Sequence, residues 1–383
     1  MGKNGKIVGG KSKAIGLAIS ILGLLLFAFF VWKAGTKEIA DGIKKLGSGF
    51  VFIILVSGLR YVVRTLGWVM CFDGEHRLRF RDAFRAYIVG DAMGNLTPLG
   101  IVASEPTKAA LVKDRVPLVD AISALAVQNL FYGLSVALFV LSGIAISLLS
   151  FHLTSGIRLV GRISLGVVIG ILLLGVTVFH LRFKFLTAGF ERLRKTRFGK
   201  RFLKEKQRKN TRIVEDTVYN FYSRHRARCA FIMFLEACFH LLGVLEVYIT
   251  LYFISDVRPT FLVAYVLEAV NRIVNVVFKF VPLRAGIDEA GTSWVLSRMY
   301  LGSLPEAVRA AMPATVIDAL MQTFQRIGTT LAIIRKARVI FWTALGVAFL
   351  IGRGVSTQEV EEETEEAMTE EMNAPVATTS ESS

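Results

Sequence analysis

The apolar runs of this chain constrain its fold more than any other feature of the sequence. A helix needs about 20 mostly apolar residues to cross the hydrocarbon core of a bilayer. Eight segments approach that length and composition, and the last is the weakest. They cover residues 14–32, 50–72, 119–149, 163–179, 229–254, 261–281, 306–334 and 339–352. With 53% hydrophobic residues overall, we expect an all-α polytopic membrane protein with about eight transmembrane helices.

The basic residues predict which segments stay in the cytoplasm. Segment 182–228 carries 16 Lys or Arg against four acids, and segments 1–13 and 75–87 are also basic. The positive-inside rule therefore places all three inside. The positive-inside rule conflicts with the expected spans at one point, because the basic segment "RKAR" (335–338) would face outward between the last two runs. The formal net charge of +16 is thus attributed to topology, and no nucleic-acid partner is expected.

These patterns divide the chain into three parts, the second of which is built from two halves and a loop. The parts are a basic cytoplasmic N-terminus (1–13), a membrane domain (14–353: first half 14–181, basic loop 182–228, second half 229–353) and an acidic tail (354–383). The tail contains nine Glu and no Lys or Arg, so we expect it to be disordered and cytoplasmic. The first apolar run has no small-x-small cleavage site after it, which favours a retained anchor over a signal peptide. The basic loop is either a solvated topogenic loop or a surface that lies on anionic lipid headgroups.

Two stretches resemble each other at an offset of 184 residues. They are "NLTPLGIVASEP" (95–106) and "KFVPLRAGIDEA" (279–290), in which Pro98 aligns with Pro282 and Glu105 with Glu289. Paired, interrupted segments in the two halves of a membrane protein are a good pointer to a transporter's binding site. Proline removes a backbone donor, and freed backbone groups cannot face lipid. We therefore expect two broken, re-entrant segments; the alternative is two ordinary loops with turn residues.

Charged residues inside the apolar runs indicate a polar interior. Four polar residues of the run 261–281 are spaced by four, three and four, which puts them on one helical face: Glu268, Arg272, Asn275 and Lys279. Arg60 and Arg64 form a like-charged pair one turn apart, so they require an anion or acids from another helix. Glu236, His240 and Glu246 of the run 229–254 are the candidates. These charges form either a ligand site or a structural ion-pair network.

The same stretches resemble a known family. "RDAFRAYIVGDAMGNLTPLGIVASEPTKAALV" and "VLEAVNRIVNVVFKFVPLRAGIDEAG" are similar to the flippase-like integral membrane family of the lysylphosphatidylglycerol synthase transmembrane region, most of all to its hopanoid-associated members. The first match rests on Asn95, Pro98, Glu105 and Lys108, and the second on Val281, Pro282, Gly286, Ile287 and Glu289. The chain departs from the family pattern at Ser104, Gln128 and Asn129.

The resemblance implies a protein that handles a membrane lipid in the bacterial inner membrane. The alternation of the runs between the basic segments predicts that both termini lie in the cytoplasm. The resemblance also implies lipid movement rather than aminoacylation, because no soluble aminoacyl-transfer domain follows the last run. Combined with the polar residues above, it gives these substrate-binding candidates: Arg60, Arg64, Asn95, Pro98, Glu105, Lys108, Glu268, Arg272, Asn275, Lys279, Pro282, Asp288 and Glu289.

Three function classes remain open from the sequence. The first is a transporter that moves an amphipathic lipid (hopanoid, phospholipid or polyprenyl-linked) between leaflets or toward a carrier; it is not an enzyme. The second is a membrane-embedded lipid transferase with Asp288 or Glu289 as the base. The third is an accessory scaffold. No nucleotide-binding loop is present, and Glu236 with His240 lacks a third metal ligand, so no cofactor and no metal are expected.

Overall fold

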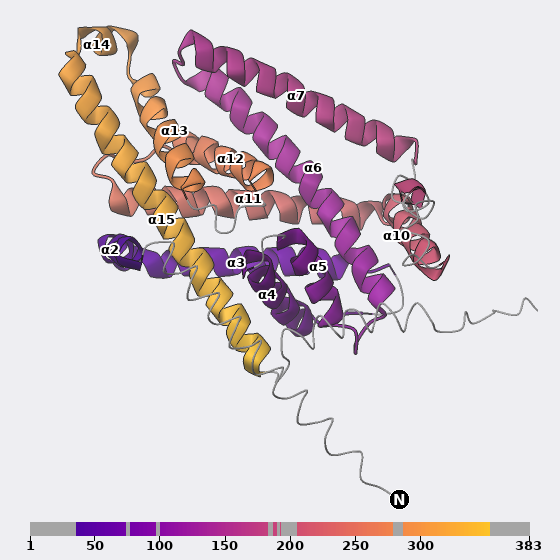
Figure 1. Cartoon of the computed structure of the whole chain (residues 1–383). Coiled ribbons are helices and arrows are strands. Elements are labelled where there is room, and N and C mark those ends of the chain that lie inside the picture. The colour runs from indigo at the N-terminus through magenta and orange to yellow at the C-terminus, as the bar shows by residue number, and fades with distance from the viewer. Residues whose placement is uncertain are drawn as a thin grey trace, which may run out of the picture.

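The computed structural model describes residues 36–73, 77–96, 100–182, 187–189, 192, 205–278 and 286–352, and the regular structure within these ranges is helical (Figure 1). The first half supplies α2 (Thr36–Leu46), α3 (Gly49–Met70), α4 (Phe80–Leu96), α5 (Gly100–Ala110), α6 (Leu118–Ser150) and α7 (Ser155–His180). The expected basic loop, 182–228, contains a helix, α10 (Glu205–Arg224), which we group with the second half. The remaining helices are α11 (Arg226–Ile254), α12 (Phe261–Val277), α13 (Ile287–Ser303), α14 (Glu306–Ala311) and α15 (Ala314–Gly352). The expected run 14–32 and both terminal segments, 1–13 and 354–383, lie outside the described residues.

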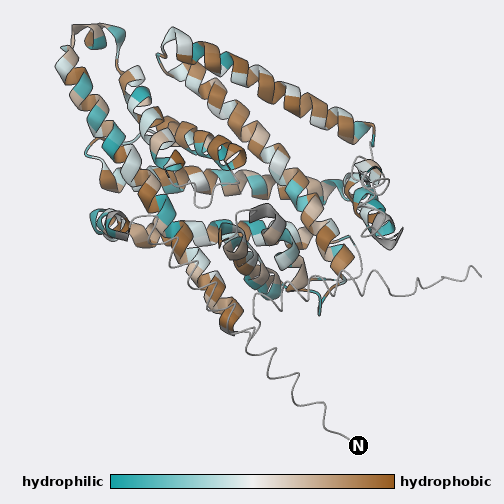
Figure 2. Cartoon of the chain, in the orientation of Figure 1, coloured by the Kyte–Doolittle hydropathy of each residue, from teal (hydrophilic) through white to brown (hydrophobic). Residues whose placement is uncertain are grey.

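Four of these helices are long and apolar enough to cross a membrane: α3, α6, α7 and α11. They correspond to the expected runs 50–72, 119–149, 163–179 and 229–254, so helices of spanning length are confirmed there. Figure 2 shows α7 as a mostly brown helix with some teal and pale turns, and no residue of α7 is buried. A helix that exposes apolar side chains over its whole length is suited to a lipid environment.

The order of helices in the first half recurs in the second. The series α2, α3, α4, α5, α6 matches α10, α11, α12, α13, α15, and α4 and α12 have 17 residues each. Equivalent helices also have equivalent packing partners in the opposite half. Helix α4 packs on α15, and its counterpart α12 packs on α6, the counterpart of α15. Likewise α2 packs on α15 and α10 packs on α6. Each half therefore lies against the other in an approximately two-fold arrangement.

The central pair of this arrangement is α3 and α11, which lie side by side and antiparallel (Figure 1). Gly49, at the start of α3, lies so close to Phe253, near the end of α11, that an added Cβ would be 2.8 Å from the ring. At the other end, Arg64 of α3 contacts Glu236 of α11. Because equivalent helices run in opposite directions, the two halves are inverted relative to each other.

Helix α15 corrects the expectation of two separate final spans, 306–334 and 339–352. The structure has the six-residue α14, and then one helix of 39 residues. At 1.5 Å per residue it is about 58 Å long. Residues 335–338 lie inside this helix, and Arg335 and Lys336 are only 7% and 4% exposed. The prediction of an outward-facing basic loop at 335–338 is therefore wrong. These charged side chains have buried partners, so the low hydropathy at this point does not mark a break between two helices.

The segments between the long helices are short. Helix α12 ends at Val277, four residues before the end of the expected run 261–281. Helices α4 and α5 pack on each other, as do α12 and α13. The 17 residues of α4, α12 or α13 extend only about 25 Å, and the 11 residues of α5 about 17 Å. Each is thus shorter than the roughly 30 Å of a hydrocarbon core.

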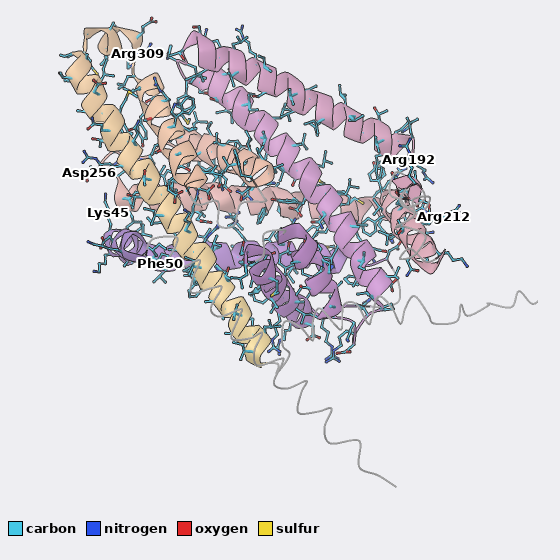
Figure 3. All side chains as sticks on the ribbon, viewed as in Figure 1. Lys45, Phe50, Arg192, Arg212, Asp256 and Arg309 are labelled. Atoms are coloured by element: carbon cyan, nitrogen blue, oxygen red, sulfur yellow. The ribbon has the colours of Figure 1, made fainter. Side chains whose placement is uncertain are left out.

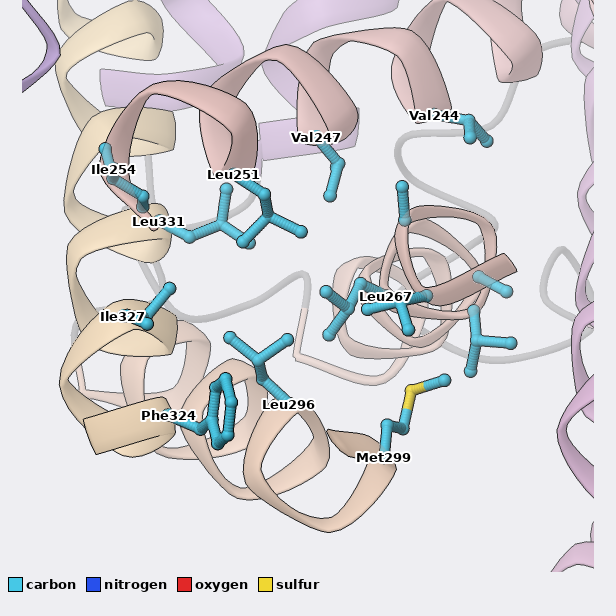
Figure 4. Packing of buried hydrophobic residues seen from close by; sticks show 14 of the residues in the cluster. Val244, Val247, Leu251, Ile254, Leu267, Leu296, Met299, Phe324, Ile327 and Leu331 are labelled. Carbon is cyan, nitrogen blue, oxygen red and sulfur yellow. The ribbon is translucent and has the colours of Figure 1, made fainter. Parts of the chain in front are cut away.

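An apolar core joins the second half together. Leu251 of α11, Leu267 of α12, Leu296 of α13 and Leu331 of α15 converge with 0–1% exposure (Figure 4). Fully burying a leucine contributes about 1.5–3 kcal/mol in water, whereas within a bilayer the gain comes mainly from close packing. This core fixes α15 against α11 and α12, and so fixes the polar layer described next.

Candidate functional site

A buried network of charges lies where the two halves meet, and its first members join α3 to α11. Arg60 Nη1 lies 2.7 Å from Glu246 Oε2, and Arg64 Nη1 lies 2.5 Å from Glu236 Oε1. All four residues are at most 8% exposed. The two arginines thus find acids on the helix expected from the sequence. Each pair crosses more than 170 residues of sequence, so the network depends on the assembled fold.

Glu268 of α12 is the acid most shared among arginines. It forms the expected one-turn pair with Arg272, and it lies 3.7 Å from Arg60 Nη2 and 3.5 Å from Arg335 Nη2. Glu268 therefore connects α3, α12 and α15. A Cβ added at Gly243 of α11 would lie 2.5 Å from Glu268 Oε1. A larger residue at that position would require the Glu268 carboxylate to shift away from α11.

Helix α15 supplies three cations that the sequence had assigned to a loop. Arg335 Nη1 donates to Thr292 Oγ1 at 3.3 Å, and Arg338 Nη1 donates to Glu246 Oε2 at 2.6 Å. Lys336 contacts Glu289 of α13. The sequence is compatible with one continuous helix here, because no proline occurs between residues 314 and 352. The charges themselves obscured it.

Aromatic rings of α6 and α11 cover one side of the network. The guanidinium carbon of Arg64 lies 4.3 Å from the centre of the Tyr132 ring. His240 is stacked on Phe139 at 4.7 Å, and its Nε2 lies 3.1 Å from Ser135 Oγ. Sequence reasoning missed Tyr132 and Phe139 as neighbours, because an aromatic residue in an apolar run carries no signal of its own. The rings therefore pack directly against the charged groups.

A buried lysine, Lys108, follows the first of the two similar stretches by two residues. Lys108 Nζ lies 3.1 Å from both Asp91 and Glu105, and 3.9 Å from the centre of the Tyr87 ring. Lys108 is 2% exposed. A Cβ at Gly90 would lie 2.4 Å from the lysine Cγ, so α4 must carry a glycine there. Glu105 and Lys108, predicted together as site residues, are thus brought into contact.

The second similar stretch begins α13. Gly286 has φ of +84°, a conformation that favours glycine, and its N–H donates to Glu289 Oε2 at 2.9 Å. This is the backbone half of a capping box, which satisfies a free N–H at a helix start. The other carboxylate oxygen of Glu289 contacts Lys336. Glu289 therefore holds its own turn and links it to α15, while Asp288 beside it is 5% exposed.

The remaining predicted site residues are less central. Asn95 Nδ2 donates to Thr343 Oγ1 at 3.2 Å and ties α4 to α15. Asn275 Nδ2 donates to the carbonyl oxygen of Asn271 at 2.7 Å, within its own helix. Pro98, Lys279 and Pro282 lie outside the described residues. In the described part of the chain, no three His, Cys, Asp or Glu side chains gather in a way that could hold a metal ion.

The fold and this network define a class: a multi-pass helical membrane protein with charges buried between two inverted halves. Comparison with family models makes the assignment specific. Residues 13–324 match the model of the lysylphosphatidylglycerol synthase TM region, and the chain belongs to that family. Comparisons with curated proteins and with solved structures give no match. Membership indicates a membrane protein concerned with lipids.

Proposed function

We propose that this protein moves an amphipathic membrane lipid between leaflets or toward a carrier, without changing the lipid covalently. The observation that carries the proposal is the buried charge network shared by α3, α11, α12 and α15. Each charge in a membrane interior costs about 2.5–3.5 kcal/mol on insertion scales. Replacing buried ion pairs by apolar side chains is often neutral or stabilising. A chain that keeps so many of them gains little stability, which favours a role in binding.

The inverted arrangement of the halves supports transport. In transporters built from inverted repeats, the substrate binds near the membrane midplane at the repeat interface, beside interrupted helices. Here the short pair α4–α5 contacts the network through Tyr87, which accepts from Arg64 Nε, and the pair α12–α13 supplies Glu268 and Glu289 to it. We infer that both pairs are re-entrant and that the lipid headgroup binds between them while its tails stay in the bilayer. Hopanoid, phospholipid and polyprenyl-linked lipids all have this amphipathic form.

Contacts at the helix ends suggest an orientation. At one end His225 Nε2 lies 2.5 Å from Asp73 Oδ1, next to α10. At the other end the His152 N–H donates to the Gly302 carbonyl oxygen at 2.9 Å. Figure 3 shows Arg192 and Arg212 at the α10 end of the α3–α11 pair, and Lys45 and Asp256 at the opposite end. Because segment 182–228 is strongly basic, we infer that the α10 end of the α3–α11 pair is cytoplasmic in a bacterial inner membrane, with both termini on that side. The basic loop would then face anionic lipid headgroups.

Cysteine labelling in cells tests this orientation. In a variant without Cys71, Cys229 and Cys238, we expect Ser303→Cys to react with an impermeant thiol reagent added outside. Ser223→Cys should react only after the membrane is opened. Both serines are exposed, so access to the reagent decides the result. Labelling of both residues from outside would contradict the orientation.

Reconstitution tests the function itself. Purified protein in liposomes should carry a fluorescent lipid from the inner to the outer leaflet, where dithionite quenches it, faster than protein-free liposomes do. Arg60→Gln should slow this movement by about tenfold or more, because it removes a buried cation from the network. Arg258→Gln, on an exposed loop, is the matched control and should move lipid normally. Movement no faster than in protein-free liposomes would refute the proposal, and a covalently altered lipid would favour a transferase.

A further inference from the structure

His240 of α11 is a titratable side chain buried between the charge network and α6. It is 2% exposed, and its ring is stacked on Phe139 at 4.7 Å and on Tyr132 at 6.2 Å, both of α6. Its Nε2 atom lies 3.1 Å from Ser135 Oγ, on the same helix. His240 therefore lies at the contact between one helix of the central α3–α11 pair and a helix outside that pair.

The hydrogen bonds of Ser135 assign the hydrogen of the neutral imidazole to Nε2. A serine hydroxyl has one hydrogen to donate, and Ser135 donates it to the Tyr132 carbonyl oxygen at 2.8 Å. Ser135 Oγ then accepts from His240, so Nε2 carries the ring hydrogen. The other ring nitrogen, Nδ1, is buried and has no hydrogen-bond partner among the described residues. His240 thus keeps an unused lone pair on Nδ1.

The arrangement has a partner for one ring hydrogen and none for a second. A proton on Nδ1 would create a buried, charged N–H group without an acceptor, which costs more free energy than an ordinary hydrogen bond contributes. The ring is therefore neutral as long as α6 stays packed on it. Tilting α6 away from α11 would separate Ser135 from Nε2 and admit water to Nδ1. Proton uptake by His240 and the position of α6 are thus linked.

Charged and titratable groups of three other helices act on His240 or stack against it. They are Arg60 and Arg64 of α3, Tyr132 of α6, and Glu268 and Arg272 of α12. Helix α15 also packs on α11 and contributes Arg338, which pairs with Glu246, while Glu236, one turn before His240, pairs with Arg64. Proton uptake adds one more positive charge to this set. The proton is therefore held only while water or a displaced acid offsets that charge.

We propose that His240 is a proton-binding site that couples lipid movement to a proton gradient. When α6 tilts away, Nδ1 accepts a proton from water, Nε2 keeps its own hydrogen, and the ring becomes an imidazolium cation. When α6 returns, Nδ1 gives the proton back to water. Coupling requires uptake on one side of the membrane and release on the other. This inference rests on the proposed function and adds its energy source.

A pH gradient across liposomes tests the coupling. The full-length protein is reconstituted with a fluorescent phosphatidylglycerol, and valinomycin with equal potassium on both sides removes the membrane potential. A gradient of about one pH unit should give up to a roughly tenfold ratio of the lipid between the two leaflets, for one proton per lipid. Without the gradient the two leaflets should hold equal amounts. Unaltered protein that moves the lipid but gives equal leaflets in both conditions would overturn the coupling.

His240→Gln identifies the residue responsible. Glutamine also carries an N–H that can donate to Ser135, but it takes up no proton in this pH range. We expect this variant to move the lipid and to lose at least nine tenths of the response to the gradient. His180→Gln, at the exposed end of α7, is the matched control and should respond normally. Thermal unfolding midpoints show which variants are folded, and a folded His240→Gln with a full response would refute the role of His240.

Nitrogen-15 NMR of histidine-labelled protein in nanodiscs separates the proton site from lipid transport. The His240 signals are those that are missing in His240→Gln. We expect protonated Nε2 and unprotonated Nδ1 at about pH 8, and a proton on Nδ1 as the pH falls to about 5, the range in which histidine changes charge. If Nδ1 gains this proton but no lipid moves, the proton site stands and lipid transport fails. If lipid moves but Nδ1 stays unprotonated throughout, transport stands and the proton site is refuted.

Discussion

Glu268→Gln should destabilise the protein more than any other single change in the network. Glu268 is 2% exposed and balances Arg272, Arg335 and, more distantly, Arg60. Glutamine keeps the shape of the side chain but leaves buried guanidinium groups without their shared anion. Breaking a buried pair in this way typically costs about 3–5 kcal/mol. The loss should appear as a lower unfolding midpoint in detergent and a lower yield of folded protein.

Two further variants decide whether charge is the cause. The double variant Glu268→Gln/Arg272→Gln removes one of the stranded cations and should recover part of the lost stability. Glu306→Gln alters an exposed carboxylate of α14 and should change stability by about 0.5 kcal/mol or less. A folded Glu268→Gln protein with an unaltered unfolding midpoint would show that Glu268 does not hold the network together.

The second large effect is expected from Glu289→Gln, in lipid movement rather than in stability. Glutamine retains an oxygen that accepts from the Gly286 N–H, so the turn before α13 persists. It removes the charge that Lys336 contacts. We expect lipid movement in liposomes to fall by about tenfold or more at a similar protein yield. Glu105→Gln should have a smaller effect, because Lys108 keeps Asp91 as a second acid.

A half-buried residue at the end of α13 serves as the control for this pair. Leu304→Ala lies outside both similar stretches and should move lipid at nearly the normal rate. Glu289→Gln and Glu105→Gln variants that both move lipid normally would refute a binding role for the two carboxylates. Loss of both proteins from the membrane would instead assign the carboxylates to structure.

The four long apolar helices, α3, α6, α7 and α11, were predictable because they depend on local sequence. The apolar runs at 50–72 and 229–254 became α3 and α11 within a few residues, since twenty apolar residues in a row leave a chain few alternatives to a spanning helix. The repeat at an offset of 184 residues was also visible, although few residues match. The packing of α4 on α15 and of α12 on α6 relates the two halves in the same way.

The final helix shows what local sequence could not reveal. Arg335, Lys336 and Arg338 resemble a cytoplasmic cluster when only their neighbours in sequence are considered. In the structure Arg335 contacts Glu268, Lys336 contacts Glu289 and Arg338 contacts Glu246. These acids are 47 to 92 residues away, so a hydropathy average over the run 306–352 cannot include them.

The antiparallel pair of α3 and α11 limits how the protein can move. Arg60 and Arg64 are tied to Glu246 and Glu236 on the facing helix, and Gly49 is in close contact with Phe253. Sliding one helix along the other by a single turn, about 5.4 Å, would break both ion pairs at once inside a membrane. Tilting the outer helices about this pair breaks neither. We therefore expect α3 and α11 to act as a fixed axle about which the remaining helices rock, first toward one leaflet and then toward the other.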